Sequence, residues 1–319
     1  MADPTEYFYD LTPDRIFAAF DQAGLRVEPT LTFLNSMENR VVRAEDEHGT
    51  RWVGKFYRPG RWTRQALREE HAFLFELQEA GLPVGPPLRL EDGDTVGTVA
   101  GIYFALFPFQ FGRCPDEVLL EHVHVLGDML ARVHEVGERS RTRHRPIIGP
   151  RCWGLDSLSV LQEENVVPPD LWSRYERTVL RLVERVERLF AQARPIRLHG
   201  DLHRGNLLWS SAGLSLVDFD DFGMGPPVQD VWLLLPGRDE DSVELREIML
   251  DVYQRRRPFD RRSLALIEPL RALKFVRYAA WVARRRNDPI FRRVFPDVES
   301  RSFWRREAEE LEAQLEHLG

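Results

Sequence analysis

One short segment of the chain, residues 199–206, combines residue types that can carry out chemistry. Its sequence is HGDLHRGN, and it lies between an apolar lead-in and a predicted strand at residues 207–209. A tight loop on such a rigid base exposes reactive side chains in a fixed geometry. Asp201 and Asn206 are five residues apart, so the loop can return both side chains to one site. A carboxylate that orients an acceptor hydroxyl, together with oxygen ligands for Mg²⁺, is what phosphoryl transfer needs.

A second acidic residue follows at the end of the next predicted strand. The turn SSAG joins residues 207–209 to residues 214–219 and predicts a hairpin. Because a hairpin brings Asp218 back beside Asn206, the two side chains can share one Mg²⁺ ion. One carboxylate with one amide suits a metal that takes few protein ligands and completes its shell with substrate phosphates.

Two other interpretations of these residues are weaker. In the first, the segment is a plain turn and Asp218 an edge-strand acid, but three polar residues spaced by a loop and a hairpin disfavour it. In the second, His199 and His203 bind the metal of a zinc or two-metal hydrolase. His199 and His203 have the i, i+4 spacing of two ligands on a helix, but the glycines of the segment disfavour a helix there. A two-metal site would also need further His and Asp residues, and the sequence does not cluster them. We expect His199 instead to support the loop through hydrogen bonds.

A lysine and a glutamate are predicted to pair upstream. Lys55 lies in the strand predicted at residues 51–57, and Glu70 in an amphipathic helix predicted at residues 63–80. At about 100° per residue, Glu70 falls near the middle of the apolar face of this helix. Since a buried carboxylate is costly without a partner, we expect it to pair with Lys55. A lysine held in this way would reach the α- and β-phosphates of ATP.

Residues 35–39 form the candidate turn that supplies hydrogen-bond donors to the phosphates. The turn, NSMEN, lies between two extended segments ahead of Lys55 and contains no glycine. The usual argument for a glycine-rich phosphate loop therefore does not apply. Ser36 can offer its hydroxyl and its amide N–H to a phosphate, but a plain polar hairpin turn explains the same residues nearly as well.

The whole chain divides into two kinds of segment. Short extended segments dominate up to residue 108, and helical periodicity dominates from residue 117 onward. We expect helices at residues 12–23, 63–80, 118–134, 171–190, 230–235, 243–253, 264–284 and 303–315, and strands at residues 31–34, 40–44, 51–57, 88–90, 102–107, 207–209 and 214–219. This order predicts a bilobal α+β fold. A small, mixed, β-rich N-terminal lobe at residues 1–108 would bind nucleotide, and a larger helical lobe at residues 109–319 would carry the loop at 199–206 and the acceptor site.

Composition excludes several classes of protein. A length of 319 residues exceeds what one hydrophobic core usually holds, which agrees with two lobes. A net charge of −7 argues against broad binding to nucleic acid. Cys114 and Cys152 are too few for a disulfide framework, residues 1–6 are acidic where a signal peptide is basic, and no stretch is long enough to span a bilayer. We expect a cytoplasmic protein, by default a monomer, with no nucleic-acid or membrane partner.

With these residues in hand, the chain resembles the aminoglycoside phosphotransferase and choline kinase branch of the kinase-like superfamily. Within that branch it is most similar to the bacterial stress response kinases, serine/threonine protein kinases of the RdoA type. The similarity runs along nearly the whole chain, and the most specific stretches are LNSMENRV at residues 34–41, KFYRP at 55–59, RLHGD at 197–201 and IEPLRA at 267–272. The last stretch has no role in general kinase chemistry, so it indicates the closer relatives.

The resemblance implies a protein-kinase-like fold, ATP and Mg²⁺ as cofactors, and a role for each matching residue. Asp201 would be the catalytic base, Asn206 and Asp218 the magnesium ligands, with Asp218 also catalytic, and Lys55 with Glu70 the pair that positions the phosphates. Asp230 would hold the catalytic loop from below, although its own context also fits a helix N-cap. Residues 106–109 would form the adenine hinge. Lys55, Asp201, Asn206 and Asp218 are all present, which disfavours a nucleotide-binding pseudokinase.

Three departures from ordinary eukaryotic protein kinases matter. Gly200 stands where those kinases have an arginine before the catalytic aspartate. Eleven residues separate Asp218 from Asp230, too few for a long activation loop, so we expect no switching by activation-loop phosphorylation. The Asp-Phe-Gly triplet is also absent, because Asp220 and Asp221 follow Phe219. These two acids can add a metal ligand or face solvent, and we expect the second.

The sequence leaves the phosphate acceptor open between a protein and a small molecule. The resemblance favours serine or threonine of a protein, whereas a kinase of amino alcohols, sugars or aminoglycosides needs the same base and metal ligands. Asp220, Asp221 and Glu268 would suit a cationic acceptor. The arginines at residues 284–286, 292–293 and 305–306 would suit an acidic protein partner, although each group is also explained as a solvated helix face.

Overall fold

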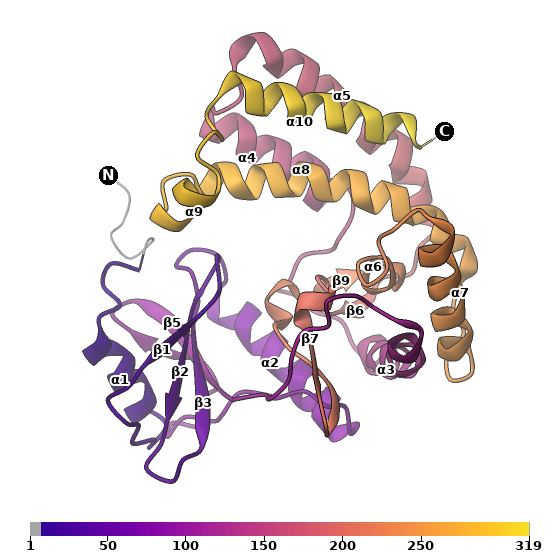
Figure 1. Cartoon of the computed structure of the whole chain (residues 1–319). Helices are drawn as coiled ribbons and strands as arrows, with labels where there is room; N and C mark the ends of the chain where they lie inside the picture. Colours follow the sequence, from indigo (N-terminus) through magenta and orange to yellow (C-terminus); the bar gives the residue numbers. More distant parts are fainter. Residues whose placement is uncertain (1–7, 319) are drawn as a thin grey trace.

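The computed structural model describes residues 8–318, so the acidic N-terminal segment at residues 1–6 lies outside the described residues. The N-terminal lobe contains a five-stranded antiparallel sheet in the order β1-β2-β3-β5-β4 (Figure 1). Its strands are β1 (Thr32–Leu34), β2 (Arg40–Glu45), β3 (Arg51–Phe56), β4 (Gly97–Val99) and β5 (Ile102–Pro108). Two helices belong to this lobe, α1 (Pro13–Asp21) and α2 (Arg64–Glu79).

The alternation of side chains along the strands gives this sheet two different faces. Phe56, Phe104 and Leu106 point to one face and form an apolar core with Phe20 of α1. Lys55 points to the other face, where it is paired in register with Val41 of β2 and Ala105 of β5. One face therefore stabilises the lobe, and the other faces the cleft between the lobes.

The strand predicted at residues 88–90 is wrong. The neighbour of β5 is β4, and the two are joined by a tight turn in which Ala100 and Gly101 both have positive φ. This is the geometry that a two-residue hairpin favours. Leu88 makes one hydrogen bond to β5, from its N–H to the oxygen of Leu106 at 2.7 Å. The prolines at residues 83, 86 and 87 lack the N–H groups that a ladder needs, which explains why this segment does not form a strand.

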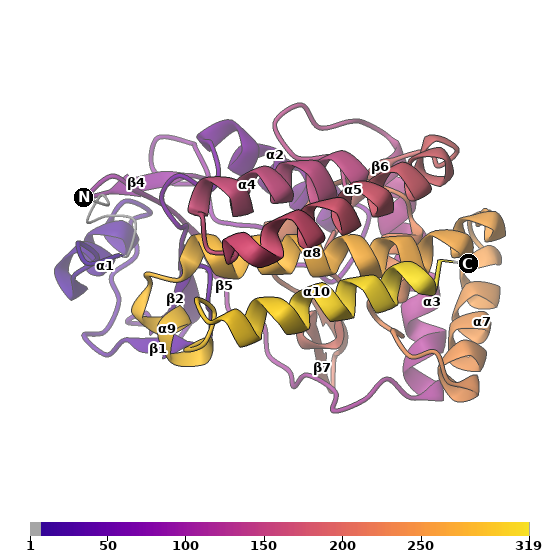
Figure 2. The ribbon, with the colours of Figure 1, turned by 90° about the horizontal axis from the view of Figure 1, so that it is seen from above.

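The C-terminal lobe is mainly helical, as predicted. Its helices are α3 (Leu120–Glu138), α4 (Asp156–Glu164), α5 (Pro169–Ala191), α6 (Val228–Trp232), α7 (Glu240–Gln254), α8 (Ile267–Arg285), α9 (Pro289–Val294) and α10 (Arg301–Glu316). Helices α4, α5, α8 and α10 pack against one another as a group, with α8 in contact with the other three (Figure 2). Between residues 8 and 318, no helix has both the length and the apolar character to cross a membrane.

Two short β-pairs lie below these four helices and to the right of the sheet of the first lobe in the view of Figure 1. Strands β6 (Ile196–Leu198) and β9 (Gly223–Gly225) pair with each other, and β7 (Leu207–Ser210) and β8 (Gly213–Leu216) form the predicted hairpin. Helix α3 packs against β6 and α7. These elements confirm a bilobal α+β architecture. The predicted boundary after residue 108 coincides with the end of β5, but the division of the chain there stays a prediction.

Helix α4 was absent from the sequence prediction. It follows a segment of π-helix at Pro150–Leu155 and buries only Ser157, Leu158 and Leu161. A helix with so few apolar positions carries a weak periodic signal. Tertiary contact with α8 accounts for its formation.

Ion pairs around Glu38 join the two lobes. Glu38 lies in the turn between β1 and β2, and its carboxylate accepts hydrogen bonds from Trp281 at 2.6 Å and Arg285 at 2.7 Å, both on α8. Arg58 and Arg61 of the N-terminal lobe lie within 3.5 Å of the same carboxylate. Burial opposes the charge, but Arg61 and Arg285 hold the pKa of Glu38 below its ordinary value.

A second interlobe contact lies beside the first. Asp288, fully buried, caps α9 by accepting from the N–H of Ile290 and also pairs with Arg58 at 2.7 Å and Arg40 at 3.5 Å. Arg58 therefore bridges the two acidic residues. The buried carboxylates and their arginines hold the lobes in one relative position.

Replacing Glu38→Gln should lower the free energy of unfolding by about 3–5 kcal/mol, because several buried arginines would lose a common partner. Urea unfolding followed by tryptophan fluorescence measures this. Glu45→Gln is the matched control, since Glu45 pairs with Arg51 across half-exposed side chains and should cost about 0–1 kcal/mol. Equal losses in the two variants would show that the Glu38 cluster does not hold the lobes together.

Candidate active site

Two cavities meet in the cleft between the lobes. The first, of about 460 Å³, lies between the sheet and the β7–β8 hairpin and is lined by Lys55 and Glu70. The second, of about 560 Å³, lies between the loop at residues 199–206 and α8, and is lined by Asp201. Both cavities are lined by Asn35, Ser36, Gly205, Asn206 and Asp218. The structure therefore brings the predicted site residues together at one junction.

A buried carboxylate holds the loop at residues 199–206 from below. The two oxygens of Asp230 accept from the N–H groups of His199 and Gly200, each at 2.9 Å. Gln229 adds a hydrogen bond to the oxygen of Gly200 at 2.9 Å. The alternative reading of Asp230 as a helix N-cap is wrong, because it lies inside α6 and Pro227 occupies the N-cap position. Its carboxylate fixes the start of the loop instead.

His199 supports the same loop from inside, as predicted. Its Nε2 lies 3.0 Å from the carbonyl oxygen of Val217 and must carry the proton, because a carbonyl only accepts. Its ring packs on Phe219, with 4.3 Å between the ring centroids. Within residues 8–318, no group of three or more His, Cys, Asp or Glu side chains is arranged to hold a metal ion.

Asn206 and Asp218 present oxygen atoms toward the junction. The Nδ2 of Asn206 donates to the carbonyl oxygen of Asp201 at 2.9 Å, which leaves its carboxamide oxygen as an acceptor. Asp218 has a left-handed backbone, with φ +61°, and its side chain is 54% exposed. Such strain is commonly kept at functional positions. An amide oxygen and a carboxylate fit Mg²⁺, which takes few protein ligands and completes its octahedron with phosphates and water.

Lys55 contacts acidic residues of the C-terminal lobe. Its Nζ lies 2.8 Å from Asp218 Oδ1 and 3.4 Å from Asp220 Oδ1. Burial opposes its charge, but Asp218, Asp220 and Glu70 raise the pKa of Lys55 above its ordinary value. The ammonium therefore stays charged and lies at the wall of the first cavity.

The predicted ion pair between Lys55 and Glu70 is wrong. Glu70 is buried on the apolar side of α2, as expected, but its carboxylate pairs with Arg145. Arg145 also donates to the backbone oxygens of Ala66 at 2.9 Å and Asp220 at 2.7 Å. Burial raises the pKa of Glu70 to about 7, against the opposing charges of Arg145 and Lys55. Glu70 thus acts on the segment after Asp218 through Arg145, which lies far from both in the sequence.

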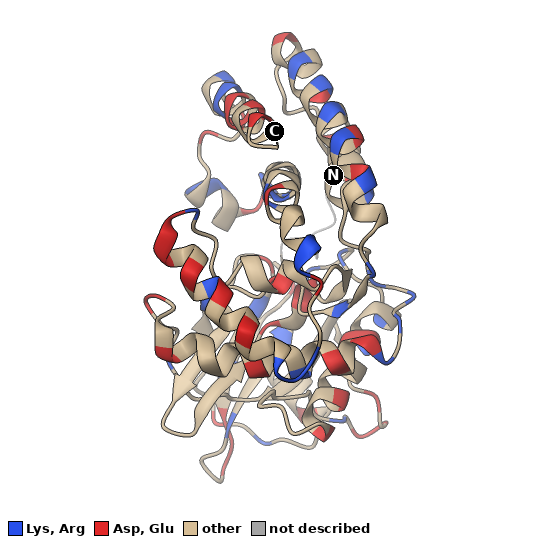
Figure 3. Ribbon diagram, turned by 90° about the vertical axis from the view of Figure 1, so that its right-hand side faces the viewer, with Lys and Arg blue, Asp and Glu red and all other residues tan. Residues whose placement is uncertain are grey.

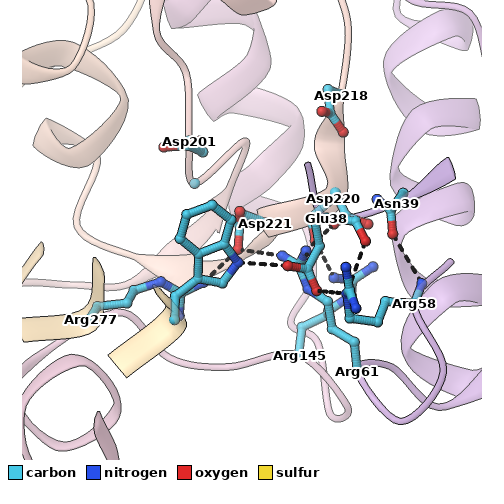
Figure 4. A network of polar contacts seen from close by, with 12 residues as sticks. Glu38, Asn39, Arg58, Arg61, Arg145, Asp201, Asp218, Asp220, Asp221 and Arg277 are labelled. Atoms are coloured by element: carbon cyan, nitrogen blue, oxygen red, sulfur yellow. Dashed lines mark hydrogen bonds and ion pairs between the residues drawn. The ribbon is translucent and has the colours of Figure 1, made fainter. Parts of the chain in front are cut away.

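Asp220 does not face solvent, contrary to the prediction, and the side chain of Asp221 is only 29% exposed. Asp220 is buried and lies 2.7 Å from Arg61, and Asp221 contacts Arg61 at 3.0 Å and Arg277 at 2.5 Å (Figure 4). Burial opposes both charges, but Arg61 holds the pKa of each carboxyl below its ordinary value. The arginines come from outside the segment at residues 218–221, so the local sequence gives no sign of them.

Asp201 has a basic partner on α8. The Nζ of Lys274 lies 2.5 Å from Asp201 Oδ1, and His203 Nε2 lies 3.6 Å from Asp201 Oδ2. The sequence prediction missed Lys274. Its residue type was the available signal, because Lys55 and Lys274 are the only lysines in the sequence.

The segment predicted as the adenine hinge lies partly in the first cavity. Phe107, Pro108 and Phe109 line it, together with the apolar side chains of Val41 and Val53. Leu106 points to the other face of the sheet and belongs to the core of the N-terminal lobe. The apolar side chains of this segment therefore form part of the wall of the first cavity.

Gly200, in the loop at residues 199–206, lies against the backbone of the segment after Asp218. Its φ is +85°, and a Cβ at this position would lie 2.2 Å from the carbonyl oxygen of Asp221. An arginine, as found there in ordinary eukaryotic protein kinases, has no room in this backbone. The absence of that arginine is therefore a consequence of close backbone packing.

Replacing Gly200→Ala should destabilise the protein more than a left-handed backbone alone explains. The backbone contributes about 1–2 kcal/mol, and displacing the Asp221 segment about 1–3 kcal/mol more. Gly93→Ala is the matched control, since Gly93 has φ +83° and nothing within 4 Å of the added Cβ. Urea unfolding of both variants measures the difference, and equal losses would contradict the close approach.

Comparison with known proteins agrees with this geometry. The phosphotransferase enzyme family matches residues 30–267. Stress response kinase A of Escherichia coli (strain K12) is 36% identical over 301 residues, which cover 94% of this chain and 91% of that protein. Serine/threonine protein kinase RdoA of Salmonella typhimurium is 35% identical over 308 residues, covering 96% and 93%. The similarity to stress response kinases that the four sequence stretches indicate is confirmed.

Solved structures confirm the fold. Amicoumacin kinase in complex with AMP-PNP, Ca²⁺ and Ami aligns with a TM-score of 0.75 and 21% identity over 96% of each chain. A microcompartment-associated aminopropanol kinase aligns with a TM-score of 0.70 and 20% identity over 95% of this chain and 98% of that one. The chain belongs to the phosphotransferase enzyme family and has the activity of a kinase.

Proposed function

We propose that this kinase transfers the γ-phosphoryl group of ATP, with Mg²⁺, to serine or threonine of a protein acceptor in a stress response. The observation that carries the proposal is the junction of the two cavities, where Asn206 and Asp218 lie between the nucleotide side and the acceptor side. A donor nucleotide in the first cavity and a hydroxyl in the second would meet there. Positioning of this kind supplies most of the catalysis of phosphoryl transfer.

Each predicted site residue then has a role. Asp201 accepts the proton of the acceptor hydroxyl, whose oxygen forms a bond to the γ-phosphorus. The bond from that phosphorus to the bridging oxygen breaks, and ADP leaves with the electron pair. Lys55 and Ser36 bind phosphates, while Glu70 positions Lys55 indirectly through Arg145 and the Asp220 segment. Asn206 and Asp218 hold Mg²⁺, which neutralises phosphate charge when bound.

The charges of the acceptor side favour a protein over a cationic small molecule. A kinase of aminoglycosides needs free carboxylates near its acceptor. Here Asp220 and Asp221 are paired with Arg61 and Arg277, and Glu268, the third predicted candidate, pairs with Arg238 at 2.5 Å. The name of one relative reported above, serine/threonine protein kinase RdoA, points in the same direction. Small-molecule phosphorylation remains the alternative that the experiment below tests.

The arginines near the C-terminus give no separate support for an acidic partner. Arg284 and Arg285 form ion pairs with Glu163 at 3.4 Å and Glu38 at 2.7 Å. Arg306 pairs with Asp297 at 2.9 Å. Basic and acidic residues lie interspersed along the outer helices of this lobe (Figure 3). Much of this charge is therefore compensated within the chain.

The segment from Asp218 to Asp230 supports activity without an activation-loop switch. It forms a 3-10 turn at Phe219–Asp221, then β9, then α6. Both Asp220 and Asp221 are held by ion pairs, and β9 is paired with β6. Because the whole segment is already ordered, it contains no disordered activation loop that phosphorylation could order.

Asp201→Ala should lower kcat by about 10²–10⁴-fold, as expected for loss of a general base. Phosphate transfer from radiolabelled ATP measures this, with casein-type proteins, amino alcohols and aminoglycosides offered separately. Asp128→Ala is the control, because Asp128 forms an exposed ion pair with Arg256 on a distant surface.

Label on serine or threonine that is lost only in Asp201→Ala would support the protein-kinase proposal. Label found only on a small molecule would reject the protein acceptor and leave the proposed roles of the site residues unchanged. Equal turnover by wild type and Asp201→Ala would reject the role given to Asp201.

A further inference from the structure

The chain uses lysine at only two positions. Of its 44 lysine and arginine residues, 42 are arginine, and the exceptions are Lys55 and Lys274. Both lysines lie in the cleft, and each contacts an aspartate of the site: Lys55 meets Asp218 at 2.8 Å, and Lys274 meets Asp201 at 2.5 Å. A chain that uses arginine almost everywhere else for positive charge has lysine at both of these places.

The difference between the two side chains gives this pattern a physical meaning. Arginine presents a planar fork that suits fixed, bidentate ion pairs, whereas lysine presents a compact charge on a flexible stem. Fixed ion pairs in this cleft do use arginine, as Arg61 and Arg277 do with Asp220 and Asp221. If Lys274 only held Asp201 in place, arginine would serve equally well. A compact, mobile ammonium suits a partner that changes during the reaction.

The position of Lys274 is suited to such a change. It lies on α8, where it lines the second cavity, and its side chain is 33% exposed. An ion pair of this exposure contributes about 0–1 kcal/mol and is easily exchanged. Arg277, one turn further along α8, is held by Asp221, and His203 is the other basic group beside Asp201.

We propose that Lys274 is a catalytic residue that binds the transferring phosphoryl group from the acceptor side. The inference rests on the proposed role of Asp201, because a group 2.5 Å from Asp201 is within reach of an acceptor hydroxyl and of the phosphorus that it attacks. As the acceptor oxygen bonds to that phosphorus, its proton passes to Asp201 and ADP leaves. The ammonium of Lys274 moves from the carboxylate to the phosphoryl oxygens and neutralises their charge. Lys55 and Lys274 thus contact the phosphates from opposite sides.

Lys274→Ala should lower kcat by about 10²–10³-fold, the usual effect of removing one group that stabilises transition-state charge. The KM for ATP and the affinity for ADP should stay within about twofold of wild type, because the nucleotide is bound by the first cavity. Lys274→Arg should restore less than a tenth of the lost activity, since the guanidinium has a different shape. Arg284→Ala, on the same helix but paired at the outer surface with Glu163, should retain full activity.

The two lysines also allow a direct measurement. Protein labelled with ¹³C at lysine Cε should give two side-chain signals, which Lys274→Arg assigns. Mg²⁺ and ADP should shift the Lys55 signal, and adding aluminium fluoride, a mimic of the transferring phosphoryl group, should then shift the Lys274 signal. A Lys274 signal that stays still while the Lys55 signal responds would show that Lys274 does not contact the phosphoryl group.

Asp201→Ala in the same assay separates the two proposals. Wild-type turnover in Lys274→Ala beside an inactive Asp201→Ala rejects the role of Lys274 alone. Wild-type turnover in Asp201→Ala rejects the proposed base. Full activity of Lys274→Arg would reject the catalytic role of Lys274 and leave it only the ion pair with Asp201.

Discussion

Carboxylates converge on the cleft between the lobes, and their mutual repulsion is the constraint on which the rest of the site depends. Five of them line the second cavity: Glu38, Asp201, Asp218, Asp220 and Asp221. Carboxylates that line one cavity and are partly removed from water repel one another by several kcal/mol unless positive charges compensate them. Each has a basic partner within 2.8 Å, respectively Arg285, Lys274, Lys55, Arg61 and Arg277. These partners come from both lobes. The carboxylates are therefore compensated only when the two lobes are held in this relative position.

Helix α8 supplies the C-terminal part of this compensation. Lys274, Arg277, Trp281 and Arg285 are spaced by three or four residues, so they share one face of the helix. In order along the helix they contact Asp201, then Asp221, and finally Glu38 twice. This face spans about 16 Å, at 1.5 Å per residue. One helix therefore sets the distances between the loop at residues 199–206, the segment after Asp218 and the turn at residues 35–39.

How much of this could be read from the sequence depends on how local each feature is. The loop at residues 199–206 and the hairpin that returns Asp218 to Asn206 are encoded within about twenty residues, and the structure has them as predicted. The burial of Glu70 was also predicted correctly, from helical periodicity. Its partner was not, because nothing near Arg145 in the sequence distinguishes it from other arginines. The same holds for the arginines that pair with Asp220 and Asp221, which lie more than 50 residues away from them in the sequence.

The glycine-free turn at residues 35–39 shows how such long-range contacts replace a local device. Glycine-rich loops can adapt their backbone to a nucleotide because glycine adopts a wide range of φ and ψ angles. This turn is instead fixed by its side chains. Ser36 Oγ accepts from the N–H of Asn39 at 3.3 Å, and Asn39 Oδ1 accepts from the N–H of Arg58 at 3.2 Å. Glu38 then ties the turn to α8.

A turn fixed in this way restricts how the cleft can open. Separating the lobes would break the contacts of Glu38 and Asp288 with partners across the cleft. Phe109, Cys114 and Gly205 line the first cavity at its accessible side, and the last two are exposed. The exposed side of the first cavity is therefore accessible while the lobes stay joined through Glu38.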